Sequence, residues 1–392
     1  MDYVHAGNAQ EESFYFKRFL EEPWYAGPRK KLRDNFGYGD HFFKVYRARD
    51  SVLLYSRGYS TLFREWQTTA EAKSVDKAFE ESVRFPKPKV PVILEISGRD
   101  TLGRLVPRFT TLYDPSSPFT DKQLRRPAPV FDVSVNGPTD RQVDIVLLPE
   151  GYTEEELNTF LKDTERFRDI LVSFDPYTQY SDRFSIRAVW APSPEKGSDI
   201  PRKDDWKATN LGTSFFTFDS ERYCMTENYW DVADLAANAP YDQIYILVNT
   251  DKYGGGAIYN YYSVSVNGNL KAGKIFIHEF GHGFAGLGDE YYTSQVSYND
   301  FYPPNIEPWE PNLTTLVNFN AKWKDMIPAN VPTPTPDTSL YDNTVGLFEG
   351  GGYSAKGVYR PSRDCLMNSF KGDKFCPVCQ EAIKKMIRFY TE

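Results

Sequence analysis

Two histidines and one glutamate with the spacing of a hydrolytic metal site stand at residues 278–282 of this 392-residue chain. They are His278, Glu279 and His282, the pattern HExxH. On a helix, positions i and i+4 lie on one face, so both imidazoles can bind one zinc ion. Glu279 then lies beside the ion, where it can act as a base toward a bound water. The chain has four histidines, so the pattern does not arise from a histidine-rich composition.

The residues after His282 offer candidates for a third metal ligand. The helix should end in the run 285–288, because glycine tolerates the left-handed turn that follows a helix C-terminus. A chain that turns back at Gly286 can bring the carboxylate of Asp289 or Glu290 to the ion. Two histidines and one carboxylate are a common catalytic zinc set. We favour Asp289 as the third ligand and keep Glu290 as the alternative.

The elements that position this site follow from the hydrophobic pattern. The helix that carries the motif has apolar residues that can bury its other faces, namely Ile275, Phe276, Ile277, Phe280, Phe284 and Leu287. Shortly before it, residues 261–266 predict a strand. An edge strand near a catalytic zinc can bind the substrate backbone by strand addition, and Ser263, Val264 and Ser265 would then be the substrate strand. An ordinary strand of the sheet is an interpretation of equal weight.

The two halves of the chain differ in pattern. Residues 1–112 contain alternating strands and turns, which predict an antiparallel β-sandwich. The turn-rich stretch 113–129 marks a boundary. Beyond it, strands alternate with helices, and a capping box at Thr153 opens one helix. We predict an α+β protein with a β-sandwich domain at 1–128 and an α/β catalytic domain at 129–392. Buried strands are expected at 143–148, 184–190 and 243–248, and a closing helix at 377–390.

Three of the four cysteines cluster near the C-terminus, at Cys365, Cys376 and Cys379. The spacing suits one structural disulfide, which would join Cys365 with Cys376 or Cys379. Free thiols are almost equally favoured. A redox pair at Cys376 and Cys379 lacks the βαβ surroundings of such motifs, and a second zinc site lacks a visible fourth ligand.

Composition and charge exclude several functional classes. The net charge is −8 and the pI is about 5.3, and no cluster of Lys and Arg dominates, so we expect no nucleic-acid partner. No apolar run approaches the ~18 residues of a transmembrane segment. The first residues carry no signal-peptide pattern. We expect a secreted, periplasmic or surface-attached protein whose export signal is absent from this sequence. No pattern indicates the oligomeric state.

Motifs spread along the chain resemble one family. Residues 360–370 read RPSRDCLMNSF, in which Cys365-Leu366-Met367 resembles the Met-turn of the metzincin zinc peptidases. Together with HEFGHGFAGLGDEY at 278–291, FCPVC at 375–379 and QVDIVLLPEGYTEEEL at 142–157, the chain resembles the bacterial IgA-peptidase family of zinc metalloproteases. The resemblance implies a secreted or surface-attached, Zn²⁺-dependent endopeptidase of metzincin-like (zincin) fold, with Met367 beneath the metal.

The chain departs from the general metzincin pattern in two places. Ala285 and Gly288 stand where metzincins carry a glycine and a third histidine, and the acidic residue comes one place later, at Asp289. Ser369 stands where some metzincins carry a tyrosine after the methionine. The sequence therefore does not identify the group that stabilises the oxyanion.

The leading hypothesis is zinc-assisted hydrolysis of peptide bonds, with Glu279 as the general base. The substrate would be an extracellular protein or glycoprotein, and the family name suggests immunoglobulin A. The long segment 292–363, rich in Pro and Gly, would wall the substrate cleft. One alternative is a surface protein that binds glycan or protein and carries a degenerate zinc domain. A closed structural zinc site is another interpretation, although no cysteine lies near His278 in sequence.

Overall fold

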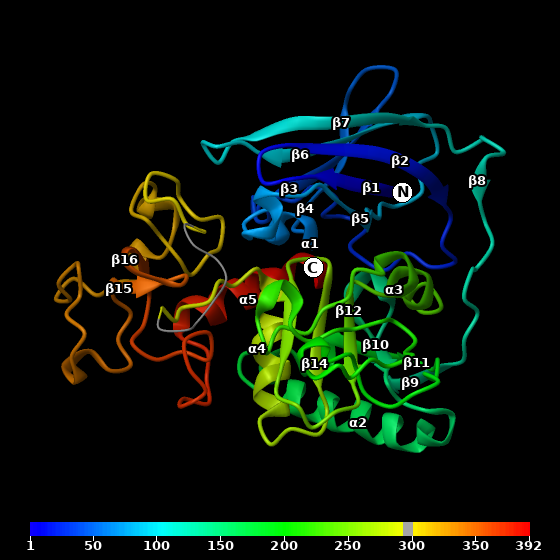
Figure 1. Ribbon diagram of the computed structural model, residues 1–392. Coiled ribbons are helices and arrows are strands. Elements are labelled where there is room, and N and C mark those ends of the chain that lie inside the picture. The colour runs from blue at the N-terminus through cyan, green and yellow to red at the C-terminus, as the bar shows by residue number, and fades with distance from the viewer. Residues whose placement is uncertain (293–300) are drawn as a thin grey trace.

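The computed structural model describes residues 1–292 and 301–392 and shows a mixed α/β protein with several sheets (Figure 1). This arrangement agrees with the predicted α+β class. Residues 293–300, which belong to the segment predicted to wall the cleft, lie outside the described residues. Among the helices described, none combines the length and the apolar character needed to cross a bilayer.

The N-terminal part of the chain forms two four-stranded sheets within the described residues. One sheet has the strand order β5-β1-β2-β8 and the other β4-β3-β6-β7. They share a core in which Tyr3, Phe43 and Leu94 are at most 1% exposed. The strands are β1 (Asp2–Gly7), β2 (Glu12–Leu20), β3 (His41–Arg47), β4 (Leu53–Tyr59), β5 (Lys77–Ser82), β6 (Val92–Arg99), β7 (Leu105–Tyr113) and β8 (Thr120–Asp121).

The C-terminal part is built on a sheet of order β13-β14-β12-β10-β11-β9. The four inner strands are parallel, and the antiparallel strands β9 and β13 form the two edges. Every residue of β10 is buried, as expected for a strand covered on both faces. The strands are β9 (Val130–Ser134), β10 (Val143–Glu150), β11 (Phe184–Val189), β12 (Gln243–Val248), β13 (Gly255–Ile258) and β14 (Tyr262–Val266).

Helices cover both faces of this sheet. Ile145 and Leu147 of β10 join a core with α2, α4 and α5, whereas the alternating Val146 and Leu148 join a second core with α3 and α1. The helices are α1 (Leu62–Trp66), α2 (Leu157–Ser173), α3 (Tyr229–Ala236), α4 (Ala272–Ala285) and α5 (Pro377–Thr391), and β15 (Phe348–Gly351) pairs with β16 (Ser354–Arg360). Short 3₁₀ turns are η1 (Glu71–Lys73), η2 (Thr139–Arg141), η3 (Glu154–Glu156), η4 (Tyr177–Arg183), η5 (Pro201–Lys203), η6 (Thr217–Asp219), η7 (Phe319–Ala321), η8 (Lys324–Met326) and η9 (Ser339–Tyr341).

Local sequence signals placed the main elements of the C-terminal part correctly. The buried strands predicted at 143–148, 184–190 and 243–248 are β10, β11 and β12. The capping box at Thr153 is present, with Glu156 as its partner, and leads into α2. The predicted closing helix is α5.

The N-terminal part packs directly on the C-terminal sheet, and the C-terminus lies beside it (Figure 1). Phe63 and Trp66 of α1 are completely buried in the core that also holds α3. The Arg57 guanidinium hydrogen-bonds the Tyr390 hydroxyl of α5 and stacks over its ring. The burial of Phe63 and Trp66 and the contact between Arg57 and Tyr390 together set the position of the N-terminal part relative to the sheet.

Replacing Phe63 with Ala should lower the free energy of unfolding by about 3–5 kcal/mol, because the cavity forms in a fully packed core. The matched control is Phe119→Ala, since the Phe119 ring is 90% exposed while the Phe63 ring is 0% exposed. The control should change stability by less than ~0.5 kcal/mol. Urea unfolding followed by circular dichroism measures both, and equal midpoints for the two variants would contradict the packing described.

Candidate active site

α4 carries the HExxH residues and ends where the glycine run was predicted to break it. Gly286 has φ 64° and ψ 30°, a left-handed conformation that side chains disfavour. Its N–H donates to the carbonyl of His282 at 3.0 Å, and the N–H of Leu287 donates to the carbonyl of Gly281 at 3.2 Å. The chain therefore reverses directly after α4 and brings Asp289 back to the helix.

His278, His282 and Asp289 converge on one point. Nε2 of each imidazole lies 3.2 Å from Oδ1 of Asp289, and the two Nε2 atoms are 3.1 Å apart. Ligands held by a tetrahedral zinc ion at about 2.0–2.1 Å stand about 3.3 Å from one another. The structure thus brings together the favoured ligand set with the spacing that one metal ion requires.

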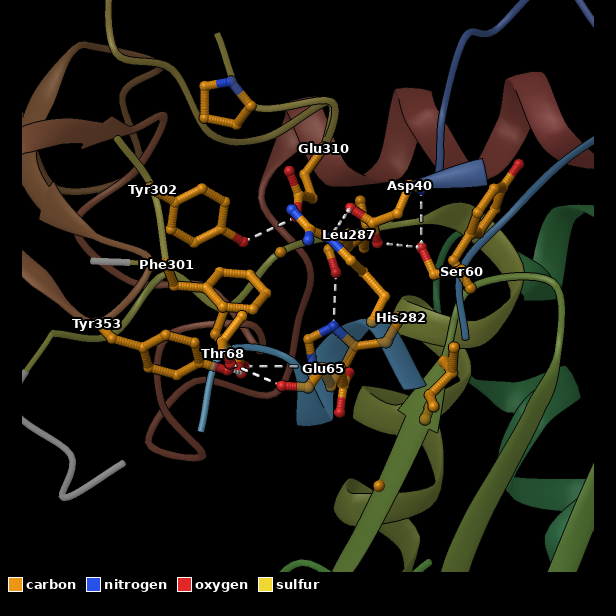
Figure 2. Close-up of a pocket in the computed structure, with 18 of the residues that line it drawn as sticks. Asp40, Ser60, Glu65, Thr68, His282, Leu287, Phe301, Tyr302, Glu310 and Tyr353 are labelled. Carbon is orange, nitrogen blue, oxygen red and sulfur yellow. Dashed lines mark hydrogen bonds and ion pairs between the residues drawn. The ribbon is translucent and has the colours of Figure 1, made fainter. Parts of the chain in front are cut away.

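The outer nitrogens of both imidazoles are held by backbone carbonyls. Nδ1 of His278 donates to the carbonyl of Leu366 at 3.0 Å. Nδ1 of His282 donates to the carbonyl of Leu287 at 2.5 Å, as Figure 2 shows. A carbonyl only accepts, so the proton is on Nδ1 and the neutral ring presents a lone pair at Nε2. This is the tautomer in which histidine binds a metal through Nε2.

The three donor atoms require a positive charge between them. Burial opposes charge on His282, but the Asp289 carboxylate outweighs burial and raises the pKa of His282 to about 9. Burial also opposes ionisation of Asp289, yet the His282 imidazole holds the pKa of Asp289 well below its usual range. A proton or a metal ion can supply the charge, and the donor set of two imidazoles and one carboxylate fits zinc.

Two tyrosines hold the second oxygen of Asp289. The hydroxyls of Tyr291 and Tyr353 donate to Oδ2 at 2.8 and 2.5 Å. Arg222 in turn donates to the Tyr291 hydroxyl at 2.9 Å. These bonds orient the carboxylate so that Oδ1 faces the imidazoles. Tyr291 lies two residues after Asp289, whereas Arg222 and Tyr353 come from distant segments that the fold alone brings to the carboxylate.

Glu279 lies against the edge strand of the sheet. A Cβ atom at Gly255 would stand 3.2 Å from Cγ of Glu279 and 2.8 Å from the carbonyl oxygen of Val264. Glycine at this position therefore lets β13 pass close to the carboxylate. Burial raises the pKa of Glu279 above its usual range, whereas the neighbouring imidazoles of His278 and His282 oppose the shift.

The alternative third ligand, Glu290, does not reach the histidines. Its carboxylate points to the other side of the chain, where Oε1 lies 3.2 Å from Sγ of Cys379. Met367 is fully buried beneath α4, and a Cβ atom at Gly281 would stand 3.1 Å from its sulfur. The methionine thus packs against the helix turn between the two histidines, where the resemblance to a Met-turn placed it.

Of the two interpretations of residues 261–266, the structure supports an ordinary strand of the sheet and contradicts a substrate strand at its edge. Ser263, Val264 and Ser265 lie in β14, which pairs with β12 on one side and with β13 on the other. All three are at most 2% exposed, so their backbone groups are not open to a substrate. The edge strand beside the site is β13. It is short and rich in glycine, so its sequence does not predict a strand.

The predicted disulfide is also absent. All four cysteines lie within the described residues and are free. Sγ of Cys365 lies 3.8 Å from Sγ of Cys379, far beyond the ~2.05 Å of a disulfide bond. The thiols are nevertheless close neighbours, because Cys376 and Cys379 begin α5 while Cys365 lies in the loop beneath α4.

The site opens into a cavity of about 650 Å³ between the two parts of the chain. Figure 2 shows the aromatic side chains of Phe301, Tyr302 and Tyr353 on one side and Asp40 with Ser60 on the other. The described part of segment 292–363 therefore contributes a wall, as predicted. The sequence did not predict that residues of the N-terminal part line the cavity, because only the packing of α1 and β4 on the sheet brings them to the site.

Comparison with known proteins agrees with these features. A family model described as IgA Peptidase M64 matches residues 131–343 and 337–387. A second model, described as Peptidase M64 N-terminus, matches residues 1–110. A search of curated proteins found no match.

Replacing Tyr353 with Phe should weaken metal binding at His278, His282 and Asp289. The hydroxyl that orients the Asp289 carboxylate is lost, and the loss of such a supporting bond costs about 10–100-fold in metal affinity. Competition with a chromophoric zinc chelator measures the dissociation constant. Tyr15→Phe is the control, because the Tyr15 side chain is 59% exposed. An unchanged dissociation constant in the Tyr353 variant would show that this bond does not support the site.

Proposed function

The chain belongs to the IgA peptidase M64 family, and on that premise we propose that it is a zinc-dependent endopeptidase of extracellular protein substrates. Family membership indicates a peptidase, and so a hydrolase. The observation that carries metal dependence is the convergence of His278, His282 and Asp289 within 3.2 Å. Three protein ligands are typical of a catalytic rather than a structural zinc site.

Each side chain of the site has a separate role in the proposed hydrolysis. His278, His282 and Asp289 would hold the zinc ion, which supplies Lewis acidity to a water and to the scissile carbonyl. Glu279 accepts the proton of the attacking water and passes it to the leaving amine. Arg222 lines the same cavity, and we assign its positive charge to the oxyanion that develops at the carbonyl.

The substrate backbone has a suitable partner in β13. The backbone groups of Gly255 bond residues on the side of β13 that faces away from β14. Its N–H donates to the carbonyl of Arg222, and its carbonyl accepts from the N–H of Cys224. Alternation along the strand directs the backbone groups of Ala257 to the same outer edge. Ala257 also lines the cavity. An extended peptide that adds to this edge would run beside Glu279 and the zinc ligands.

The finer arrangement and the setting of the protein are part of the same proposal. We assign residues 1–128 to a β-sandwich domain and residues 129–392 to a catalytic domain of zincin type. The protein would be secreted, periplasmic or attached to the cell surface. Its substrate would be a protein or glycoprotein, with immunoglobulin A as the candidate that the family description suggests.

Replacing Glu279 with Gln should abolish peptide hydrolysis and leave the zinc content unchanged. The amide has nearly the same shape but cannot accept the proton, and general-base catalysis contributes about 10²–10⁴-fold. Cleavage of a protein mixture, followed by mass spectrometry, measures activity, and elemental analysis measures zinc. Glu155→Gln is the control, since Glu155 is an exposed glutamate that does not line the cavity. Normal cleavage by the Glu279 variant would refute the assigned role.

A further inference from the structure

A second group of metal-binding side chains lies behind the active site. Glu290, Cys365, Cys376 and Cys379 are all buried, and one donor atom of each lies within 4.8 Å of the donor atoms of the others. Oε1 of Glu290 is 3.2 Å from Sγ of Cys379 and 4.0 Å from Sγ of Cys376. None of these atoms belongs to the set that faces His278.

The spacing of the donors is that of a tetrahedral metal site. Zinc binds thiolates at about 2.3 Å and carboxylates at about 2.0–2.2 Å, which sets neighbouring sulfurs about 3.8 Å apart and a sulfur and an oxygen about 3.5 Å apart. The sulfurs of Cys365 and Cys379 are 3.8 Å apart. The two distances from Glu290 to sulfur, 3.2 and 4.0 Å, lie on either side of the expected value.

One oxygen of the buried Glu290 carboxylate lacks a partner among the described residues. The residue is 0% exposed, and Oε2 has no hydrogen-bond partner among the described residues. Oε1 accepts from the side chain of Asn312 at 2.9 Å. Burying a carboxylate with one oxygen unsatisfied is costly unless a proton or a cation neutralises it. The neighbouring thiols do not supply positive charge, whereas a metal ion between the four side chains does.

Backbone amides are placed to stabilise thiolates here. Cys376 is the N-cap of α5, and its sulfur accepts from the N–H of Cys379 at 3.5 Å. The N–H of Cys376 donates to the sulfur of Cys365 at 3.2 Å. Such bonds, together with the positive end of the helix dipole, lower the energy of negatively charged sulfur. The cluster therefore holds both the donors and the amides that a zinc–thiolate site uses.

We propose that Glu290, Cys365, Cys376 and Cys379 bind a second zinc ion in a closed structural site. Four protein ligands leave no position for a water or substrate, which is the mark of structural zinc. The thiols lose their protons when the ion binds. Glu290 is the fourth ligand that the cysteine spacing alone did not reveal.

The second ion joins the segments that hold the first one. Glu290 follows Asp289 directly, and its N–H donates to the carbonyl of Met367 at 2.8 Å. Cys365 precedes Leu366, whose carbonyl accepts from Nδ1 of His278. Fixing Glu290 and Cys365 to the start of α5 thus fixes both the third ligand of the catalytic site and the carbonyl that orients its first histidine.

A third cluster, formed by His5, Glu12 and His41, does not call for a metal ion in the same way. Nδ1 of His5 already contacts the Glu81 carboxylate at 3.1 Å. Arg108 pairs with Oε1 of Glu12 at 2.8 Å. The charges in this cluster are balanced by protein groups, whereas the hydrogen-bond partners of Glu290 are thiols and one amide, and Arg360 acts on it electrostatically without a salt bridge.

The test counts metal and thiols in the purified whole chain. Elemental analysis should find two zinc ions per chain in the wild type and one in a His278→Ala/His282→Ala variant. Protein denatured anaerobically without reductant should release all four thiols to a thiol reagent. After exchange with cobalt(II), the histidine variant should keep the near-ultraviolet charge-transfer absorption of thiolate ligation. Cys379→Ser should lose one ion, whereas Cys224→Ser, which removes a buried cysteine in another core, should keep both.

The wild-type measurements keep the test decisive even where a variant fails to fold. One zinc ion per chain with no cobalt–thiolate absorption would overturn the proposal. A count of two thiols would also overturn it, because a disulfide would then occupy the cluster. Neither result depends on peptidase activity. Failure of the second site is therefore distinguishable from failure of the proposed function.

Discussion

The left-handed turn at Gly286 is the constraint on which the candidate active site depends. A helix alone can present His278 and His282 on one face, but the third donor has to come from outside it. The turn closes α4 and returns the chain along it, so that the carbonyl of Leu287 meets Nδ1 of His282 at 2.5 Å. Three residues after the turn, Asp289 reaches the same point in space. The backbone conformation of one glycine therefore sets both the tautomer of a histidine and the place of the carboxylate.

The cleft depends on a second constraint, the packing of the N-terminal part against the sheet. The N–H of Ser60 donates to the carbonyl of Tyr259 at 3.0 Å, just beyond the end of β13. Asn260 donates through its side chain to the carbonyl of Gly58 at 2.9 Å. The edge strand that faces the substrate cavity is thus anchored by β4. This explains why the cavity is lined by residues as far apart in the chain as Ser60 and Tyr353.

Sequence patterns predicted the parts of this structure that local chemistry determines. The capping box at Thr153, the continuous apolar run of β10 and the glycine run after α4 each act within a few residues, and each was read correctly. Whether a strand is an edge or an interior strand depends on pairing with distant segments, so the sequence left β14 open between a substrate strand and an ordinary strand of the sheet. The same limit hid the partner of the cysteines, because Glu290 and Cys379 are 89 residues apart. Tyr353, which bonds Asp289 from 64 positions away, was missed for the same reason.

Asp289 and Glu290 show how the two proposed metal sites can depend on one short segment. Consecutive side chains of an extended chain point to opposite sides, so the segment can face the histidines with one carboxylate and the cysteines with the next. Its backbone is held as well, because the N–H of Gly352 donates to the carbonyl of Asp289 at 2.8 Å. A rotation of the segment that moved Glu290 from the cysteines would turn Asp289 from the histidines. A metal ion bound by Glu290 and the cysteines would therefore resist the rotation that would also move Asp289 away from His278 and His282.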